Sequence, residues 1–346
     1  MSERMGGRRT RTVPNRPYEE NGGDGTPTLS ESPAQSKGVF AEAETEALAD
    51  AVIADSGGAA AIDSLKEADT GVLPKKRFGP VFWISVGWVV GIIVLAAIAS
   101  WIHLPDPKAT GVAKPRLGLF SGGHLLGTDE LGRDQLSRVI YGARVSMTVG
   151  FASIFFGIIV GGFFGVIAGF FRGKSESVIM GGMDVLLAFP ALVLALAIIT
   201  FLGQNLPNVI LAISILAIAP IARLIRSATL SVSQREFVLA ARSLGAKNWR
   251  IITREILPVV MLPVFSYALI GVAVAVTAEG ALAFLGLSVA APTPTWGGMI
   301  TDGRVYLQQD PWIAFIPAIV LFITVLALNF AGDSLRTRFD VREGGL

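Results

Sequence analysis

Residues that could do chemistry are few in this chain, and each such group is missing a part that its chemistry needs. Residues 168–175 nearly spell a phosphate-binding loop, but Ala168 replaces the first glycine and an apolar helical segment precedes it in place of a buried strand. His103 and His124 have no acidic cluster at metal-ligand spacing beside them. The sequence contains no cysteine, and no apolar segment places a base near a serine nucleophile. We therefore expect no catalytic residue, no cofactor site and no metal site on this chain.

Residues 236–258, EFVLAARSLGAKNWRIITREILP, form the most informative segment, a basic stretch between two long apolar stretches. Small and apolar residues recur in it at helical spacing, first as Phe237, Ala240, Ala241 and Leu244 and then as Trp249, Ile252 and Ile256. Gly245 separates the two series and is placed to end the first helix in a left-handed conformation. The pattern predicts two short helices that dock against an acidic partner surface; the alternative is an amphipathic helix lying on a membrane.

The composition indicates the elements that must position this segment. Hydrophobic residues make up 52% of the chain and charged residues 16%, against about a quarter charged in soluble domains. We predict an all-α polytopic membrane protein, in which a hydrocarbon core of about 30 Å requires about 20 apolar residues per helix. Six segments qualify as transmembrane helices: 81–102, 145–171, 180–202, 209–230, 257–277 and 312–331.

Prolines and glycines inside these segments predict how the helices bend and pack. Prolines inside predicted spans include Pro190, Pro220 and Pro317. Each proline leaves a backbone carbonyl of its helix without a hydrogen-bond donor, and neighbouring helices can supply one. We therefore expect kinks and not breaks at these positions. Gly161, Gly165 and Gly169 lie on one helix face, where they allow another backbone to approach closely.

Basic residues gather at one end of the predicted spans, which sets their orientation. They precede the first span, follow the second and sixth, and run from the fourth to the fifth, as Lys75, Lys76, Arg77, Arg172, Lys174, Arg223, Arg226, Arg235, Arg242, Lys247, Arg250, Arg254, Arg336, Arg338 and Arg342. The 236–258 segment and both termini are therefore predicted to be cytoplasmic.

Residues 1–78 differ from the membrane domain, residues 79–346. Early arginines are followed by a Gly/Pro/Ser/Thr-rich run and by an acidic, alanine-rich stretch. We predict a cytoplasmic, mostly disordered tail with a short helix around 39–54 and no cleavable signal peptide. The tail is interpreted as solvated, with docking or lipid binding as the alternative.

With these elements in place, the 236–258 segment resembles the EAA loop of ABC-importer permeases, the coupling helix that docks on the ATP-binding subunit. The resemblance implies that the coupling residues are Glu236, Ala240, Ala241, Arg242, Gly245, Leu257 and Pro258. The chain departs from the motif at Leu239, where the namesake glutamate is expected, and at Glu255, where histidine is frequent. Without this carboxylate, docking would depend on the shape of the loop.

Three further stretches are similar to the C-type permease of dipeptide, oligopeptide and nickel ABC importers. Residues 126–146 resemble the stretch before its second span, residues 278–297 its outer segment after the fifth, and Asp184 with residues 188–190 its third. The chain is identified as a member of this family over about residues 75–342.

This resemblance implies the type I ABC-importer permease fold with six transmembrane helices, in the plasma or inner membrane of a prokaryote. It implies a non-catalytic permease that forms a heterodimer with a second homologous permease. Two cytoplasmic ATP-binding subunits would bind ATP and Mg, and an extracytoplasmic substrate-binding protein would deliver di- or oligopeptides, with nickel or glutathione as alternatives. No nucleic-acid partner is expected.

Alternative interpretations apply to several residues predicted on the outer side of the membrane. Glu279, Phe284, Leu285 and Trp296 are candidates for a gate or outer segment. Glu279 would either receive a peptide ammonium or satisfy an irregular 281–288 segment. Asp129, Arg133 and Asp134 are candidate contacts for the binding protein, or members of a self-folded loop. We expect Asp184 to cap a helix or to pair with Arg172 or a partner subunit.

Two other classes of protein remain as alternatives. A gradient-driven secondary transporter or channel would need an acidic or histidine relay at a span centre, or an inverted pair of broken spans, and the sequence shows neither. A membrane-anchored scaffold would use the tail as its working part, so deletion of residues 1–70 would distinguish it.

Overall fold

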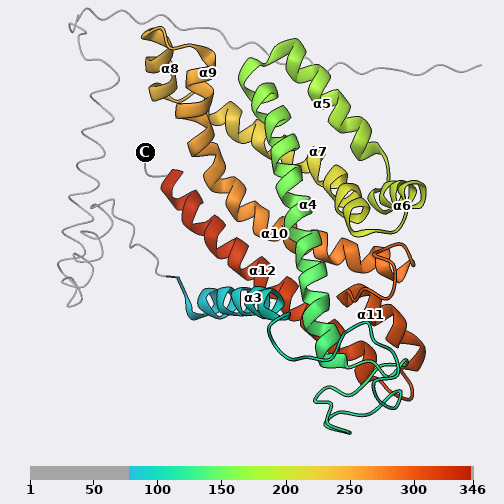
Figure 1. Ribbon diagram of the computed structural model, residues 1–346. Coiled ribbons are helices and arrows are strands. Elements are labelled where there is room, and N and C mark those ends of the chain that lie inside the picture. Colours follow the sequence, from blue (N-terminus) through green and yellow to red (C-terminus); the bar gives the residue numbers. More distant parts are fainter. Residues whose placement is uncertain (1–77, 344–346) are drawn as a thin grey trace, which may run out of the picture. The chain divides into compact units, whose positions relative to one another are not determined.

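A computed structural model describes the backbone of residues 78–343 and the side chains of residues 78–338. The helix predicted at 39–54 lies outside the described residues. The regular elements of the described part are all helical (Figure 1): α3 (Pro80–Ile98), α4 (Gln135–Phe171), α5 (Gly173–Ala188), α6 (Ala191–Leu202), α7 (Leu206–Val232), α8 (Glu236–Ser243), α9 (Asn248–Arg250), the π-helical turn η1 (Ile251–Ile256), α10 (Leu257–Phe284), α11 (Trp296–Gly303), the 3-10 turn η2 (Arg304–Tyr306) and α12 (Trp312–Glu343).

Five continuous helices of the described part are long and apolar enough to cross a membrane, and the bent pair α5 and α6 makes a sixth if it counts as one span. The predicted all-α membrane fold is thereby confirmed. Several bounds differ from prediction, most clearly for α4, which begins at Gln135 and not at residue 145. Its first turns are polar but buried against the preceding loop, and hydropathy alone therefore does not assign them to the helix.

The predicted kink at Pro190 is a break. α5 ends at Ala188, α6 begins at Ala191, and their axes differ by 84°. Phe189 has an extended backbone (φ −80°, ψ 135°), which is the conformation favoured before a proline, whose missing N–H also removes a helical hydrogen bond. α7 and α12, in contrast, stay helical through Pro220 and Pro317.

The glycine face predicted on α4 packs directly against α7. A Cβ atom on Gly161 or on Gly165 would lie 2.6 Å from a backbone carbonyl oxygen of α7, and one on Gly169 would lie 2.7 Å from another. Only glycine permits this approach, so the prediction of a close helix contact is confirmed. α10 packs on α4 and α12, and α3 contacts α12 and α4.

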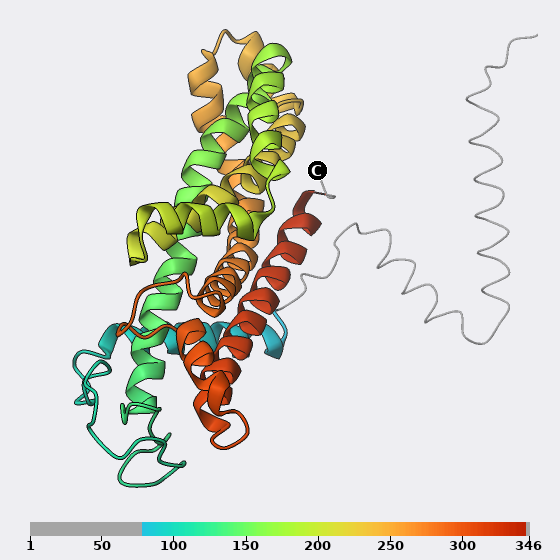
Figure 2. The same cartoon turned by 90° about the vertical axis from the view of Figure 1, so that its right-hand side faces the viewer.

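Segments outside the predicted membrane spans lie at two opposite ends of the bundle. α8 and α9 lie at one end, and the loop between α3 and α4 lies with the start of α11 at the other, as both views show (Figures 1 and 2). Each end contains candidate residues from the sequence.

Candidate functional site

The segment at 236–258 folds as two helical pieces joined at a glycine. α8 begins after Arg235, whose backbone is extended, and ends where Leu244 N–H donates to the Ala240 carbonyl at 3.0 Å and Ala246 N–H to the Ala241 carbonyl at 3.1 Å. Gly245 has φ +77°, the left-handed conformation predicted for it. Glu236 in the first turn and Arg242 in the last complement the helix dipole.

The second piece is continuous with a membrane helix. α9, η1 and α10 run without a break from Asn248 to Phe284 and include Leu257 and Pro258 at the start of α10. The wide π turn directly precedes Pro258, whose ring would clash with the carbonyl four residues earlier in a regular α-helix. The second piece of the segment is therefore an extension of the membrane helix α10.

An apolar cluster fixes α8 to the ends of the membrane helices. Val238, Ile251 and Ile256 are fully buried in it. Their partners come from α4, α7 and α10 and include Val166, Phe170, Ile225, Val232 and Val260. This cluster, which we call the inner core, holds one face of α8 so that the segment is attached on that side and free on the other.

The free face of the segment exposes large apolar side chains alongside the charged Glu236, Arg242, Lys247 and Arg250. Leu244 is 89% exposed and Trp249 is 74% exposed, and Phe237 and Leu239 are also exposed. The two alanines differ, since Ala240 is exposed whereas Ala241 packs partly on the inner core. Large exposed apolar side chains on a non-membrane element are typical of a protein interface.

A pocket of about 290 Å³ lies beside α8 and is lined by Phe170, Arg172, Ser233, Gln234, Leu239 and Arg242. Arg172 donates from Nη2 to Ser233 Oγ at 3.3 Å, and the Arg242 guanidinium lies 5.6 Å from the centre of the Phe170 ring. The lining contains two arginines and no carboxylate. Leu239 thus leaves the pocket cationic at the position where the EAA motif has its glutamate.

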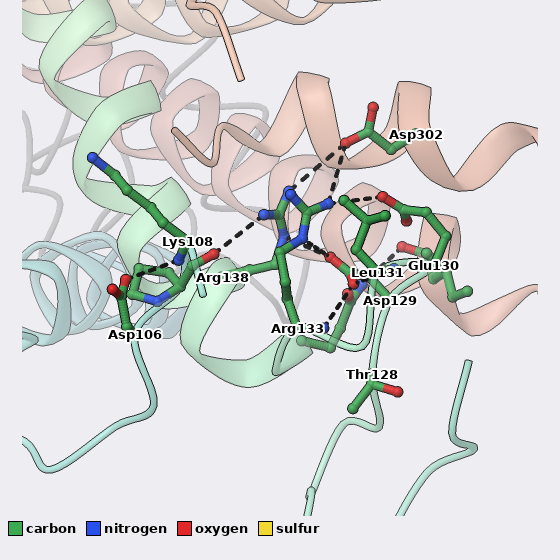
Figure 3. Close-up of polar contacts among 12 residues, drawn as sticks. Asp106, Lys108, Thr128, Asp129, Glu130, Leu131, Arg133, Arg138 and Asp302 are labelled. Atoms are coloured by element: carbon green, nitrogen blue, oxygen red, sulfur yellow. Dashed lines mark hydrogen bonds and ion pairs between the residues drawn. The ribbon is translucent and has the colours of Figure 1, made fainter. Parts of the chain in front are cut away.

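A network of charged side chains holds the outer loop to the bundle (Figure 3). Asp129 Oδ2 accepts from Arg133 Nε at 2.5 Å and lies 3.2 Å from Arg138 Nε. Arg133 also donates to Glu130 at 2.7 Å. Asp302 of α11 lies 3.7 Å from Arg138 Nη2, so the network joins the outer loop, α4 and α11. We call these five residues the outer ionic cluster.

Burial changes the titration of two members of this cluster. Burial raises the pKa of Glu130, and the negative charge of Asp129 raises it further, against the opposing effect of Arg133. Burial likewise raises the pKa of Asp302, although Arg138 and Arg133 oppose it.

The candidate binding-protein contacts are mainly internal. Asp129, Arg133 and Asp134 are only 2%, 3% and 4% exposed. Asp134 caps α4 by accepting from Ser137 N–H at 2.7 Å, and its other oxygen lies 2.6 Å from His124 Nδ1. Of the two interpretations, the geometry favours the self-folded loop. The His124 contact was not foreseen, because it depends on the path of the loop.

Glu279 of α10 is fully buried and accepts from Ser288 Oγ at 2.6 Å and from Ser146 Oγ at 3.2 Å. The same Ser146 hydroxyl accepts the backbone N–H of Trp296, whose ring nitrogen donates to the Val139 carbonyl at 3.0 Å. Glu279 and Trp296 therefore join α10 and α11 to α4, which agrees with the structural interpretation of Glu279. The segment after it is helical through Phe284, so irregular backbone starts later than the predicted residue 281.

Phe284 and Leu285 of the proposed outer segment are 54% and 50% exposed, with the Arg304 guanidinium 4.7 Å from the centre of the Phe284 ring. They are separate from the buried pair Glu279 and Trp296. The four gate candidates therefore do not form one site.

Asp184 pairs with Arg223 of α7 at 2.5 Å, and not with Arg172, which was one of the three possibilities expected for it. A second ion pair, Glu176 with Arg226, ties the same two helices together. Arginines within the fourth apolar segment were the signal in the sequence for these pairs, because intramembrane charges require a partner.

Comparison with known proteins assigns the family. Residues 161–343 match the binding-protein-dependent transport system inner membrane component family. The dipeptide transport system permease protein DppC of Alkalihalophilus pseudofirmus is 38% identical over 257 residues, 73% of this chain and 84% of the relative. The glutathione transport system permease protein GsiD of Escherichia coli O6:K15:H31 is 38% identical over 258 residues, 75% of this chain and 85% of the relative.

A solved structure supports the same fold. A chain from inward-facing MetNI methionine ABC transporter crystals aligns with a TM-score of 0.50 at 21% identity, over 58% of this chain and 96% of that one. The chain belongs to the family of binding-protein-dependent transport system inner membrane components. It is a multi-pass, non-catalytic permease subunit of an ABC importer, of the type that its sequence motifs resemble.

Proposed function

We propose that this permease forms a translocation pathway for di- or oligopeptides together with a second homologous permease. A binding protein delivers the peptide from outside, and two ATP-binding subunits bind ATP and Mg on the cytoplasmic side. The dipeptide permease among the relatives supports this substrate class. Glutathione is the second candidate, supported by the glutathione permease, and nickel stays a prediction from the shared motifs.

The observation that carries the coupling role is the two-sided character of the 236–258 segment. One face is fixed in the inner core and joined to α10, while the other exposes Ala240, Leu244 and Trp249. A docking element must have both properties, because contacts that differ between two states can drive a transition only through a rigid connection. Glu236, Arg242 and Gly245 shape this element, and Leu257 and Pro258 begin the helix that carries its movement.

The distribution of basic residues supports one orientation in the membrane. The basic residues around α8 and at the ends of α4, α7 and α12 support a cytoplasmic position, in a prokaryotic cell, for this end of the bundle and for both termini. The outer loop and α11 then face the binding protein. Because Asp129, Arg133 and Asp134 are buried, this contact falls to exposed residues of the same loop, such as Phe120, Leu125 and Leu131.

Affinity purification from native membranes tests the proposal. The tagged chain should bring a second permease, two ATP-binding subunits and a binding protein with it, and the reconstituted assembly should take up labelled dipeptide when ATP is present. Purification of the chain alone, with uptake driven by an ion gradient, would contradict the proposed role. Uptake of glutathione or nickel in place of dipeptide would keep the role and replace the substrate.

A further inference from the structure

An ion pair between α5 and α7 lies at a depth where charges are rare. Asp184 is eleven residues from the start of α5 at Gly173, about 16 Å along the helix, and Arg223 is nine residues from the end of α7, about 14 Å. Both helix ends carry the basic residues that mark the cytoplasmic side. Within the predicted apolar spans 180–202 and 209–230, Asp184 is four residues and Arg223 seven residues from the end on the basic side, so the pair lies in the cytoplasmic half of these spans.

The pair is exposed, although its depth would favour burial. The side chains of Arg223 and Asp184 are 52% and 62% exposed, whereas those of Arg226 and Glu176 in the neighbouring pair are 32% and 23% exposed. The bond from Arg223 Nη2 to Asp184 Oδ1 leaves the second carboxylate oxygen and other guanidinium N–H groups free to bind a ligand. An exposed charge pair at this depth requires water or a polar partner, because lipid solvates it poorly.

The surface around the pair mixes small, polar and apolar side chains. Exposed residues beside it include the small or polar Ser177, Gly181, Pro220 and Ser227, and on α5 also the apolar Val178, Val185 and Leu187. α4 and α12 instead expose large aromatic side chains: Phe155, Phe163, Phe315 and Phe322. The exposed charges of the pair therefore fit a water-filled passage at this position better than the bilayer, because lipid solvates them poorly.

We infer that Asp184 and Arg223 line the translocation pathway and bind the ammonium and carboxylate groups of a zwitterionic substrate as it passes. The inference rests on the proposed import function and adds a site to it. Two opposite charges held 2.5 Å apart complement a molecule that carries both charges. When the Asp184–Arg223 ion pair opens, Asp184 can pair with the substrate ammonium and Arg223 with the substrate carboxylate, so that no charge is left without a partner.

Cysteine labelling tests the position of the pair, because the chain has no cysteine of its own. In the assembled transporter, we expect the Asp184→Cys and Arg223→Cys variants to react with a charged, water-soluble thiol reagent at least ten times faster than Phe163→Cys. A free dipeptide should slow this reaction several-fold, and the same dipeptide with an acetylated N-terminus and an amidated C-terminus should not. Labelling no faster than that of Phe163→Cys, or a cross-link to the second permease, would overturn the inference.

Neutral variants test the substrate contact against a purely structural clamp. Asp184→Asn and Arg223→Gln should lower dipeptide uptake at least tenfold in assembled transporters, whereas Glu176→Gln, in the more buried pair between the same helices, should lower it less than threefold. Equal losses in all three variants would mean that both pairs only clamp the helices. If the wild-type assembly takes up no dipeptide, the proposed substrate is wrong. If the Asp184→Cys variant, without reaction with the thiol reagent, takes up dipeptide normally, only this inference is overturned.

Discussion

A Cβ atom on Gly165 of α4 would stand 2.6 Å from the carbonyl oxygen of Ala222 in α7. The two backbones are in contact at this point, and the Ile225 side chain of α7 lies 3.0 Å from the same Cβ position. α4 and α7 therefore behave as one packed unit. The ends of both helices contribute to the inner core that holds α8, so this unit supports the proposed coupling segment.

Gly165→Ala should destabilise the protein, because neither backbone can move away without separating the helices. A cost of about 1–3 kcal/mol is expected for overpacking of this kind. Gly181→Ala is the matched control, since no heavy atom lies within 4 Å of a Cβ at that helical position. Thermal unfolding in detergent should show a lower Tm for Gly165→Ala only; equal Tm values would contradict the contact.

Gly245→Trp should abolish uptake while leaving the protein inserted in the membrane. The φ of +77° disfavours any side chain with a Cβ, and the indole adds bulk at the turn between α8 and α9. Gly245→Asn is the control, because asparagine tolerates this conformation and should keep most of the uptake. Normal uptake by a well-expressed Gly245→Trp variant would count directly against the docking role.

Glu279→Ala should loosen α11 from α4. The substitution leaves the Ser146 and Ser288 hydroxyls without their acceptor, and a buried polar group left without its partner costs about 1–3 kcal/mol. Limited proteolysis should then cut the 285–295 connection faster than in the wild type. Phe284→Ala, at an exposed site five residues later, should not change the cutting rate, and equal rates in the two variants would refute this role of Glu279.

The outer ionic cluster should weaken as pH rises. The folded-state pKa values of Glu130 and Asp302 are raised by burial, so each carboxyl favours folding while it is protonated and loses that contribution as pH increases through its raised pKa. The loss begins above about pH 4, the ordinary range of carboxyls. Hydrogen exchange of residues 104–134 should therefore show less protection at pH 7 than at pH 4.

Glu130→Gln is the variant that isolates this effect. Its amide oxygen can still accept from Arg133, but it does not titrate. The variant should protect the outer loop more than the wild type at pH 7 and equally at pH 4. Identical pH dependence in both proteins would show that Glu130 does not contribute.

Local patterns predicted much of the fold and the candidate site. Helical spacing and Gly245 were sufficient to predict α8 and its left-handed end. The glycine spacing on α4 was sufficient to predict a close contact with another helix, which is α7. Each of these depends on neighbouring residues along one helix, where sequence spacing translates directly into geometry.

Long-range contacts were not predictable in the same way. The partner of Asp184 is 39 residues away, and the acceptor of the Trp296 ring nitrogen is 157 residues away. The break at Pro190 also depends on tertiary packing, since Pro220 and Pro317 leave their helices continuous. The same packing decides that Ala240 is exposed while Ala241 contacts the inner core.

The difference between the two alanines gives the most direct measurement of the central claim, that the free face of α8 docks on an ATP-binding subunit. Ala240→Arg places a charge on that face without disturbing the inner core, and Thr337→Arg places one on an exposed turn of α12 as a control. In reconstituted transporters, Ala240→Arg should abolish peptide uptake and peptide-stimulated ATP hydrolysis at normal insertion, and Thr337→Arg should keep both. Full stimulation and uptake by Ala240→Arg would contradict the account.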